Sequence, residues 1–487
     1  MRPQWLFFAL LVLCYAFFLE PAGTNTISRY DMVWALAHGT AIIDPLHKNT
    51  IDVSYYHGHF YSPRSIGLSL LALPVFEIVQ AIMRNPPVSH PTMDVAVPLI
   101  NLFTVVLVAM IATIVFYRFV LRLRPTLANT PIPLVATTAF ALGTLEYPFA
   151  VSFFSHAAGG GLIFCGFYLL YRAPRSPHPI RYVLTAGLVV GFAVITEYPT
   201  AVIMLVLCAY VLAIFPGRRL QMLILFGVAM APSALVLAWY DWFAFGNPFH
   251  ISYDSVVGQQ FSGQHSGLFG INLPQPAGLE QILAWPRGLL VESPFLIFVV
   301  FGFIRWWRSA ARPSAELLVC LAISILYPLL IASYYLPMGG ENLPGPRLLV
   351  PMLPFFCLAL AWALDVKNIL VRGAFAVLLA LGILLSFLYV VLGVYEYHTI
   401  LTYPIANLFL PVLQNGSVPI KLGHIPTPYN LATLYFHMAQ AGSLYIVLVP
   451  LAAWTTYLAV SLVLWQVPPV AREPSAPGDS TGKSFAG

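Results

Sequence analysis

Charge is what this sequence of 487 residues lacks most. Only 8% of its residues are charged and 59% are hydrophobic, whereas a soluble globular domain has about 25% charged residues. We therefore expect most of the chain to lie in lipid. The net charge of +5 is better explained by the distribution of basic residues across a membrane than by affinity for an anionic polymer, so we predict no nucleic-acid partner.

Cysteine and nucleotide-binding motifs are scarce as well. The five cysteines all lie in apolar runs, and their spacing fits neither a disulfide nor a zinc site: Cys14, Cys165, Cys208, Cys320 and Cys357. The sequence has no Gly-rich loop after a strand and no internal repeat. An enzyme that uses soluble nucleotide sugars would need such a domain in the cytosol, and the short inner loops leave no room for one.

Long apolar stretches are abundant. About 20 residues suffice to cross a bilayer as a helix, and twelve stretches qualify, near residues 3–19, 95–117, 131–151, 154–171, 182–197, 199–215, 220–240, 293–309, 315–334, 347–364, 370–394 and 442–465. The run at 66–83 is interrupted by Pro74 and Glu77, so we interpret it as a helix on the outer membrane surface. The prediction is an all-α polytopic membrane protein with about twelve transmembrane helices and short amphipathic helices in its first outer loop.

The basic residues indicate the orientation. With the N-terminus inside, the short inner loops hold most of the 23 Lys and Arg residues but only four of the 18 acids, Glu316, Asp365, Glu473 and Asp479. We therefore predict a protein of the cytoplasmic (cell) membrane with both termini cytoplasmic. Residues 1–465 would form one transmembrane domain with outer loops at 20–94, 241–292 and 395–441, and residues 466–487 would form a disordered cytoplasmic tail.

The first outer loop carries an unusual number of ionisable and aromatic residues. Charged groups are costly near a bilayer and usually mark function when they cluster there. The candidates in this loop are Asn25, Arg29, Asp31, Asp44, Asp52, His57, His59, Tyr61 and Arg64. Solvated charges on an amphipathic surface helix are the simpler explanation of the segment around Asp31. A zinc site at His57 and His59 is disfavoured because no further ligand follows at metal spacing.

A second group lies at the outer ends of the predicted spans. His156 begins a span, Glu146 and Glu197 end spans, Tyr198 follows Glu197, and the segment MGGENLPGPRLLVP contains Glu341 and Arg347. Each of these side chains could simply place its polar group among the lipid headgroups without any further role. Their common depth under the same loop favours a shared cavity instead, with Arg347 recognising a lipid phosphate.

Several motifs, taken in order, resemble a known family. The segments SRYD, AHGTAIIDP, IDVSYYHGHFYSPRSIGLSLLALP, GTLEYPFAVSFFSH, GFAVITEYP, PRGLLVESP and GPRLLVPMLPF are similar to bacterial members of the GT-C glycosyltransferases. The nearest branch contains protein O-mannosyltransferases and aminoarabinose transferases, and the resemblance covers residues 1–365. It implies a GT-C-like helix arrangement and an inverting sugar transfer from a polyprenyl-phosphate carrier. It also implies a general base in the first outer loop, and cations or a divalent metal at the departing phosphate.

The sequence departs from that family at the acid position. Relatives place an acidic residue where this chain has Thr24-Asn25, so we favour Asp31 as the base, with Asp44 and Asp52 as alternatives.

Other departures concern the phosphate and the sugar. Arg64 stands where aminoarabinose transferases have Lys-Pro-Pro, while His156 and Glu197 replace their Asp and Lys. The metal ligands and the sugar therefore stay open.

These observations predict an integral-membrane glycosyltransferase acting on the outer face. Arg64 and Arg347 would hold the carrier phosphate. The sugar site would be shaped by His57, Tyr61, His156 and Glu197. The partners are a polyprenyl-phosphate sugar donor, an acceptor that is a lipid, glycan or protein, and membrane lipids. No cofactor is certain, and a divalent metal (Mg or Mn) is an option. The alternative is a lipid or sugar transporter or flippase, which would need polar groups at mid-membrane depth. A polysaccharide polymerase or ligase is a third option, but such a protein usually has its long loop late in the chain, whereas here the loop is early.

Overall fold

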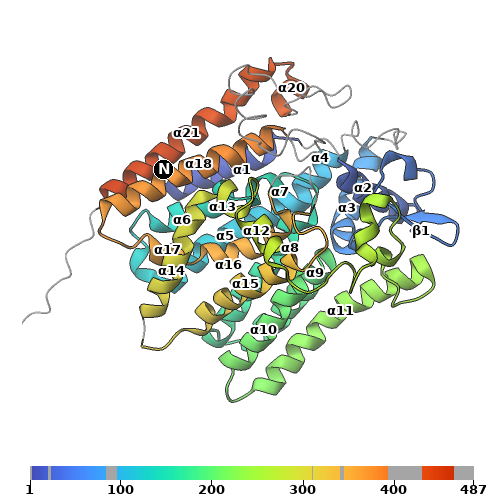
Figure 1. Ribbon diagram of the computed structural model, residues 1–487, viewed down its shortest axis with the longest axis horizontal. Helices are drawn as coiled ribbons and strands as arrows, with labels where there is room; N and C mark the ends of the chain where they lie inside the picture. Colours follow the sequence, from blue (N-terminus) through green and yellow to red (C-terminus); the bar gives the residue numbers. More distant parts are fainter. Residues whose placement is uncertain are drawn as a thin grey trace, which may run out of the picture.

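The computed structural model of the chain describes residues 3–19, 23–83, 96–309, 311–339, 345–392 and 430–465, and most of these residues are helical (Figure 1). The first half contains α1 (Pro3–Phe17), α2 (Thr24–Ala37), α3 (Ile66–Ile82), α4 (Ala96–Asn101), α5 (Leu107–Leu123), α6 (Ile132–Gly143), α7 (Glu146–Ala150), α8 (Ser155–Arg172), α9 (Pro179–Thr196), α10 (Thr200–Ile214) and α11 (Arg219–Phe245). A π-helical segment, Leu102–Val106, joins α4 to α5.

The second half contains α12 (Pro276–Leu283), α13 (Leu289–Glu292), α14 (Ile297–Arg308), α15 (Ala315–Ala332), α16 (Leu353–Cys357), α17 (Leu360–Ala363), α18 (Ile369–Leu392), α20 (Leu431–Tyr435) and α21 (Gln440–Leu464). Short 3₁₀ segments connect several of these: η1 (His47–Asn49), η4 (Pro125–Leu127), η5 (Ala173–Arg175), η6 (Ser252–Ser255), η7 (Gln259–His265), η8 (Pro294–Leu296) and η9 (Arg347–Met352). The predicted loop 395–441 falls largely, and the tail 466–487 wholly, outside the described residues.

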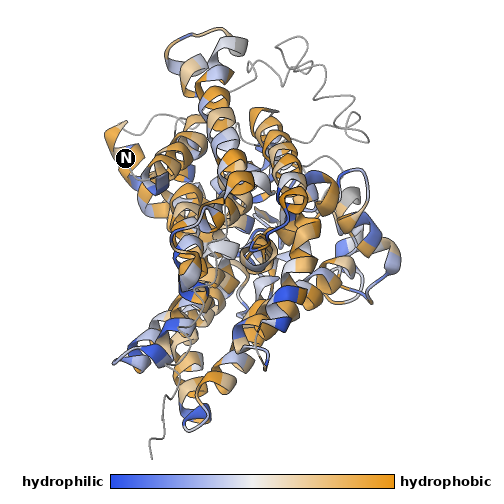
Figure 2. Cartoon of the chain, turned by 90° about the vertical axis from the view of Figure 1, so that its left-hand side faces the viewer, coloured by the Kyte–Doolittle hydropathy of each residue, from blue (hydrophilic) through white to orange (hydrophobic). Residues whose placement is uncertain are grey.

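The apolar helices confirm the predicted all-α, multi-pass architecture. Six described helices are long and apolar enough to cross a membrane: Val97–Leu123, Pro179–Thr196, Arg219–Phe245, Ala315–Ala332, Ile369–Val391 and Gly442–Leu464. Other predicted spans form shorter pieces; the stretch 131–151, for example, breaks at Thr144 between α6 and α7. The count of about twelve therefore stays a prediction. Hydrophilic residues gather at helix ends and in the connecting segments (Figure 2).

Glycines allow the central helices to pack closely. Helix α9 packs between α8 and α11. A Cβ added at Gly187 of α9 would lie only 2.5 Å from the backbone oxygen of Phe226 in α11, and one at Gly166 of α8 would lie 2.4 Å from Val190. Small residues permit such close helix contacts in membrane proteins. The result is a rigid frame whose ends position the site.

The segment predicted as the first outer loop folds against this frame through α2, α3 and a β-hairpin. Strands β1 (Ser54–Tyr56) and β2 (His59–Tyr61) are antiparallel. Their two-residue turn consists of His57 (φ 47°) and Gly58 (φ 91°), as expected for a tight hairpin in which both turn residues have positive φ. The hairpin brings together the residues on either side of it, Asp52 and Arg64.

Candidate functional site

A cavity of about 440 Å³ lies where the segment predicted as the first outer loop meets the ends of α8, α9 and α15. We call it the site cavity. Its polar end consists of Asn25, Arg29, Asp52, Arg64, Ser65, Ser155, His156, Glu197 and Arg347, and its apolar wall includes Val194, Ala201, Val202, Leu237, Leu330 and Ile331. Eight of the residues predicted as site residues, including Tyr198, therefore lie around one cavity.

Arg29 is the buried cation of the cavity. Its side chain is 3% exposed and donates hydrogen bonds to Asn25 Oδ1 (3.2 Å), the Ser65 carbonyl oxygen (3.3 Å) and Ser155 Oγ (2.7 Å). All three partners are neutral, and Arg29 forms no ion pair with a carboxylate among the described residues. Burial and the charge of Arg64 lower the pKa of Arg29 to about 10. A buried charge with no directly bonded carboxylate is costly, so this position favours an anionic ligand.

Glu197, Ser155 and His156 form a second polar cluster. Ser155 Oγ donates to Glu197 Oε2 at 2.5 Å, and His156 Nδ1 lies 3.0 Å from the same oxygen. Gly159 makes the arrangement possible, because a Cβ there would lie 2.5 Å from the Glu197 Cβ. Ser155 therefore links the Glu197 carboxylate to Arg29.

Asp52 and Arg64 face each other at the base of the hairpin. Arg64 Nε donates to Asp52 Oδ2 at 2.6 Å, and its Nη2 contacts the same oxygen. Both side chains line the cavity, and that of Asp52 is 2% exposed. Because the antiparallel register pairs Ser54 with Tyr61, residues just outside the two strands must approach each other. Asp52 thus has a fixed orientation.

Arg347 approaches the cavity from the other side. It begins η9, and its guanidinium lies 5.2 Å from the ring centroid of Phe154. Gly339 packs against it, since a Cβ there would lie 2.7 Å from Arg347 Nε. Three arginines, Arg29, Arg64 and Arg347, thus line the cavity against two carboxylates, Asp52 and Glu197, which leaves an excess of positive charge.

Asp31 and Asp44 do not line the cavity. Asp31 is fully buried in α2, and this burial raises its pKa to about 8, opposed by the Asn49 side chain. Asp44 is bound locally: it accepts the Phe60 amide at 2.7 Å and lies 2.7 Å from His59 Nδ1. Slight burial opposes ionisation of Asp44, but these two contacts outweigh it and lower its pKa.

The other predicted residues lie elsewhere. His57 and His59 are exposed at the hairpin turn, and Tyr61 packs its ring 4.9 Å from that of Phe245. Glu341 lies outside the described residues. Glu146 is buried in α7 and is not part of the cavity wall.

Sequence reasoning also missed several cavity residues. Ser65 and Ser155 are adjacent to predicted positions and lie inside quoted motifs, so neighbouring polar residues were the available signal. Tyr253, Gln264 and Tyr334 come from segments far along the chain. The Tyr334 hydroxyl donates to Gln264 Oε1 at 2.5 Å, a contact that no local pattern predicts.

The donor set does not fit a divalent metal held by protein ligands alone. Among the described residues no group of three or more His, Cys, Asp and Glu side chains could hold a metal ion. Asp52 and Glu197, the two carboxylates at the cavity, are engaged by Arg64 and by His156 with Ser155. The mechanism proposed for the cavity therefore uses no metal.

Neither a family model nor a curated protein matches the sequence. The fold is similar to that of an archaeal oligosaccharyltransferase, AglB from Archaeoglobus fulgidus in complex with an inhibitory peptide and a dolichol-phosphate. The TM-score is 0.48 at 13% identity, over 95% of this chain and 56% of AglB, so this chain spans little more than half the length of AglB. The fold is also similar to that of ArnT from Cupriavidus metallidurans bound to undecaprenyl phosphate. The TM-score is 0.46 at 13% identity, over 95% of this chain and 77% of ArnT.

At these identities and TM-scores the likeness says nothing about superfamily or activity.

Proposed function

We propose that this chain is an integral-membrane glycosyltransferase that moves a sugar from a polyprenyl-phosphate carrier to an acceptor hydroxyl on the outer face of the cytoplasmic membrane. One observation carries this proposal: the site cavity joins a cationic end to an apolar wall built from α9, α10, α11 and α15. A sugar linked to a lipid phosphate has the same two parts. The apolar wall suits the lipid, and the cationic end suits the phosphate.

Arg29 and Arg347 are the proposed phosphate ligands. A guanidinium binds phosphate through parallel hydrogen bonds and keeps its charge when buried. Arg29 has only neutral hydrogen-bond partners, so a phosphate would supply the counter-ion that its burial favours. A phosphate is already a good leaving group, and electrostatic stabilisation of the developing charge is the assistance it needs.

Asp52 is the proposed general base. Of the three aspartates that the sequence suggests, Asp52 is the one that lines the cavity, which favours it over Asp31. Arg64 binds Oδ2 and leaves Oδ1 for an acceptor hydroxyl. The role of Arg64 is thus to orient the base, whereas the sequence suggested a direct contact with phosphate.

The proposed reaction is a single inverting displacement. The Asp52 carboxylate takes the proton of the acceptor hydroxyl while that oxygen bonds to the anomeric carbon, on the face opposite the phosphate. The bond between the anomeric carbon and the phosphate oxygen breaks, and its electron pair stays on the phosphate, next to Arg29 and Arg347. Asp52 later releases its proton to water. A base in this role contributes about 10²–10⁴-fold to the rate.

The test is transfer or hydrolysis of radiolabelled polyprenyl-phosphate hexoses and pentoses by the purified protein. Asp52→Asn should lower the rate by about 10²–10⁴-fold. Asp44→Asn is the matched control, because Asp44 belongs to the same loop but binds His59 and lies outside the cavity. Asp31→Asn should also stay near the wild-type rate, because Asp31 does not line the cavity.

Two results would contradict the proposal. If Asp31→Asn lowers the transfer rate while Asp52→Asn keeps the wild-type rate, the general base is Asp31. Movement of the lipid across vesicle membranes without any sugar transfer would instead support the transporter or flippase alternative.

A further inference from the structure

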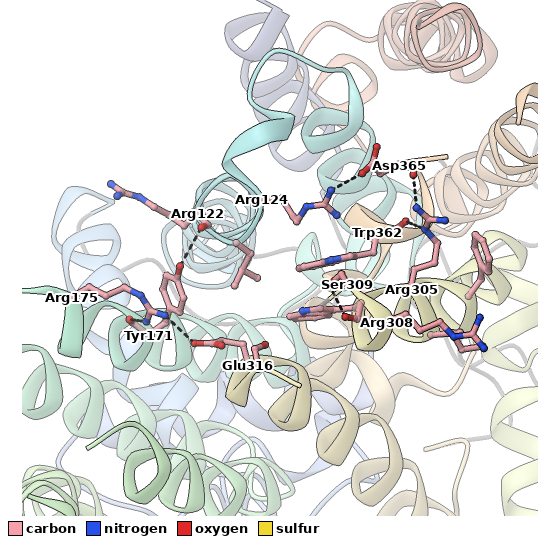
Figure 3. Close-up of a pocket in the computed structure, with 15 residues that line it drawn as sticks. Arg122, Arg124, Tyr171, Arg175, Arg305, Arg308, Ser309, Glu316, Trp362 and Asp365 are labelled. Carbon is pink, nitrogen blue, oxygen red and sulfur yellow. Dashed lines mark hydrogen bonds and ion pairs between the residues drawn. The ribbon is translucent and has the colours of Figure 1, made fainter. Parts of the chain in front are cut away.

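A second cavity, of about 790 Å³, is lined by five arginines, Arg122, Arg124, Arg175, Arg305 and Arg308. We call it the arginine pocket (Figure 3). Its arginines come from the C-terminal ends of α5 and α14, from η5 and from the residue that follows α5. Segments far apart in the sequence therefore bring their guanidinium groups to one place.

The arginine pocket and the site cavity lie at opposite ends of the same helices. In α8, Ser155 and His156 line the site cavity while Tyr171 lines the arginine pocket. Tyr171 follows Ser155 by sixteen helical positions, which corresponds to a rise of about 24 Å. Helix α15 repeats the arrangement, with Glu316 at the pocket and Leu330 at the cavity. In the predicted topology, this end of the bundle is the cytoplasmic one.

The charges of the pocket are not balanced by its own residues. Only two carboxylates line it: Arg124 pairs with Asp365 at 2.6 Å, and Arg175 pairs with Glu316 at 3.5 Å. Figure 3 shows these two pairs as separate groups of side chains.

The remaining three arginines have no such partner. Arg305 donates to the backbone oxygens of Trp362 (3.0 Å) and Asp365 (2.8 Å). The exposed Arg122 and Arg308 form no ion pair with a carboxylate in the described part of the chain. The pocket thus offers an excess of positive charge to a ligand.

Buried aromatic rings hold part of this cationic surface in place. Trp306 and Trp362 stack with centroids 3.9 Å apart, and Arg124 lies 5.1 Å above the Trp362 ring. Arg175 lies 3.9 Å above the Tyr171 ring. Tryptophan and tyrosine typically occupy the membrane–water interface, so the geometry places fixed guanidinium groups at headgroup depth.

We propose that the arginine pocket binds the phosphate headgroup of an anionic phospholipid from the adjacent leaflet. Basic pockets between transmembrane helices on the cytoplasmic side recognise such headgroups, and arginine forks match phosphate oxygens. A general excess of arginine on the inner side would explain scattered residues. It would not explain five around one cavity backed by stacked tryptophans. This lipid site does not depend on the proposed glycosyltransferase activity.

The experiment is native mass spectrometry of the full chain in detergent, titrated with dioleoylphosphatidylglycerol and, separately, with dioleoylphosphatidylcholine. The double variant Arg122→Gln/Arg308→Gln removes two exposed arginines of the pocket and should weaken phosphatidylglycerol binding by about 30-fold. The matched control is Arg218→Gln/Arg219→Gln. These two arginines are equally exposed and are predicted to lie on the same side of the membrane, but they are not part of the pocket. The control should bind phosphatidylglycerol as the wild type does.

Three outcomes would overturn the proposal. Equal loss in both double variants would mean that surface charge in general attracts the lipid. Equal binding of phosphatidylcholine would mean that the anionic headgroup is not recognised. Inorganic phosphate or pyrophosphate that binds at low concentration and displaces the lipid would make a soluble phosphate the ligand. Because both substituted arginines are exposed, an unchanged melting temperature should accompany every measurement.

Discussion

Replacement of Arg29 by methionine should separate phosphate binding from folding. Methionine keeps an unbranched apolar stem but loses the hydrogen bonds to Asn25, Ser65 and Ser155. Each such bond from a charged donor contributes about 1.5–3 kcal/mol. The variant also removes a buried guanidinium whose desolvation costs several kcal/mol. Because these two effects are of similar size and opposite sign, we expect little change in the melting temperature of the unliganded protein.

The effect should appear when polyprenyl phosphate is added. At a lipid concentration of 100 times the wild-type Kd, binding stabilises the wild type by about 2.7 kcal/mol. If Arg29 contributes about 2 kcal/mol to phosphate binding, Kd rises about 30-fold, and the same concentration stabilises the variant by only about 0.9 kcal/mol. The assay is thermal unfolding in detergent with and without undecaprenyl phosphate.

Lys48→Met provides the control for this experiment. Lys48 is an exposed cation of the same loop outside the cavity, and its removal should leave the lipid-induced shift unchanged. The sugar-transfer rate of Arg29→Met should fall by about 10²–10³-fold. The reasoning is refuted if Arg29→Met keeps the wild-type thermal shift and the wild-type rate.

Two further predictions concern packing and pH. Gly159→Ala places a Cβ 2.5 Å from the Glu197 Cβ. In thermal unfolding it should destabilise the protein by about 1–3 kcal/mol. The control is Gly227→Ala in helix α11, where an added Cβ meets nothing within 4 Å, and this change should be neutral or stabilising. Burial raises the pKa of Asp31 to about 8 from 3.8, so the folded state binds this proton more tightly than the unfolded state. Stability should therefore fall as pH rises between these two values, by at most about 1.4 kcal/mol per pH unit. Asp31→Asn should show a flatter profile of melting temperature against pH, and equal slopes would contradict the assignment.

The multi-pass helical fold was predictable because apolar runs of sufficient length leave few alternatives to membrane helices. The residues that form the cavity were predictable in part for a related reason. Ionisable residues such as His156, Glu197 and Arg347 are rare in such a chain, and those at the same helix ends meet in space. Glu146 marks the limit of this argument. It shares their predicted depth, but the break at Thr144 places it in α7, away from the cavity wall.

The hairpin could be recognised in the sequence, but its consequence could not. The His57-Gly58 turn between two short aromatic segments is a local signal. The pairing of Asp52 with Arg64 follows only from the register of the two strands, and a shift of one residue would change which side chains share a face.

The choice among the three aspartates depends on which face of α2 points toward the cavity. Residues four apart share a helix face, and Asn25 and Arg29 are four apart and line the cavity together. Asp31 follows Arg29 by two positions, which rotates it by about 200° around the helix axis, so it must point away from the cavity if Arg29 points into it. The sequence could not reveal this, because every residue of α2 from Asn25 to Val33 is buried and a helix buried on all sides has no polar face to orient it. Arg29, buried among neutral partners, therefore indicates the direction of the site, and that direction supports the proposal of Asp52, rather than Asp31, as the base.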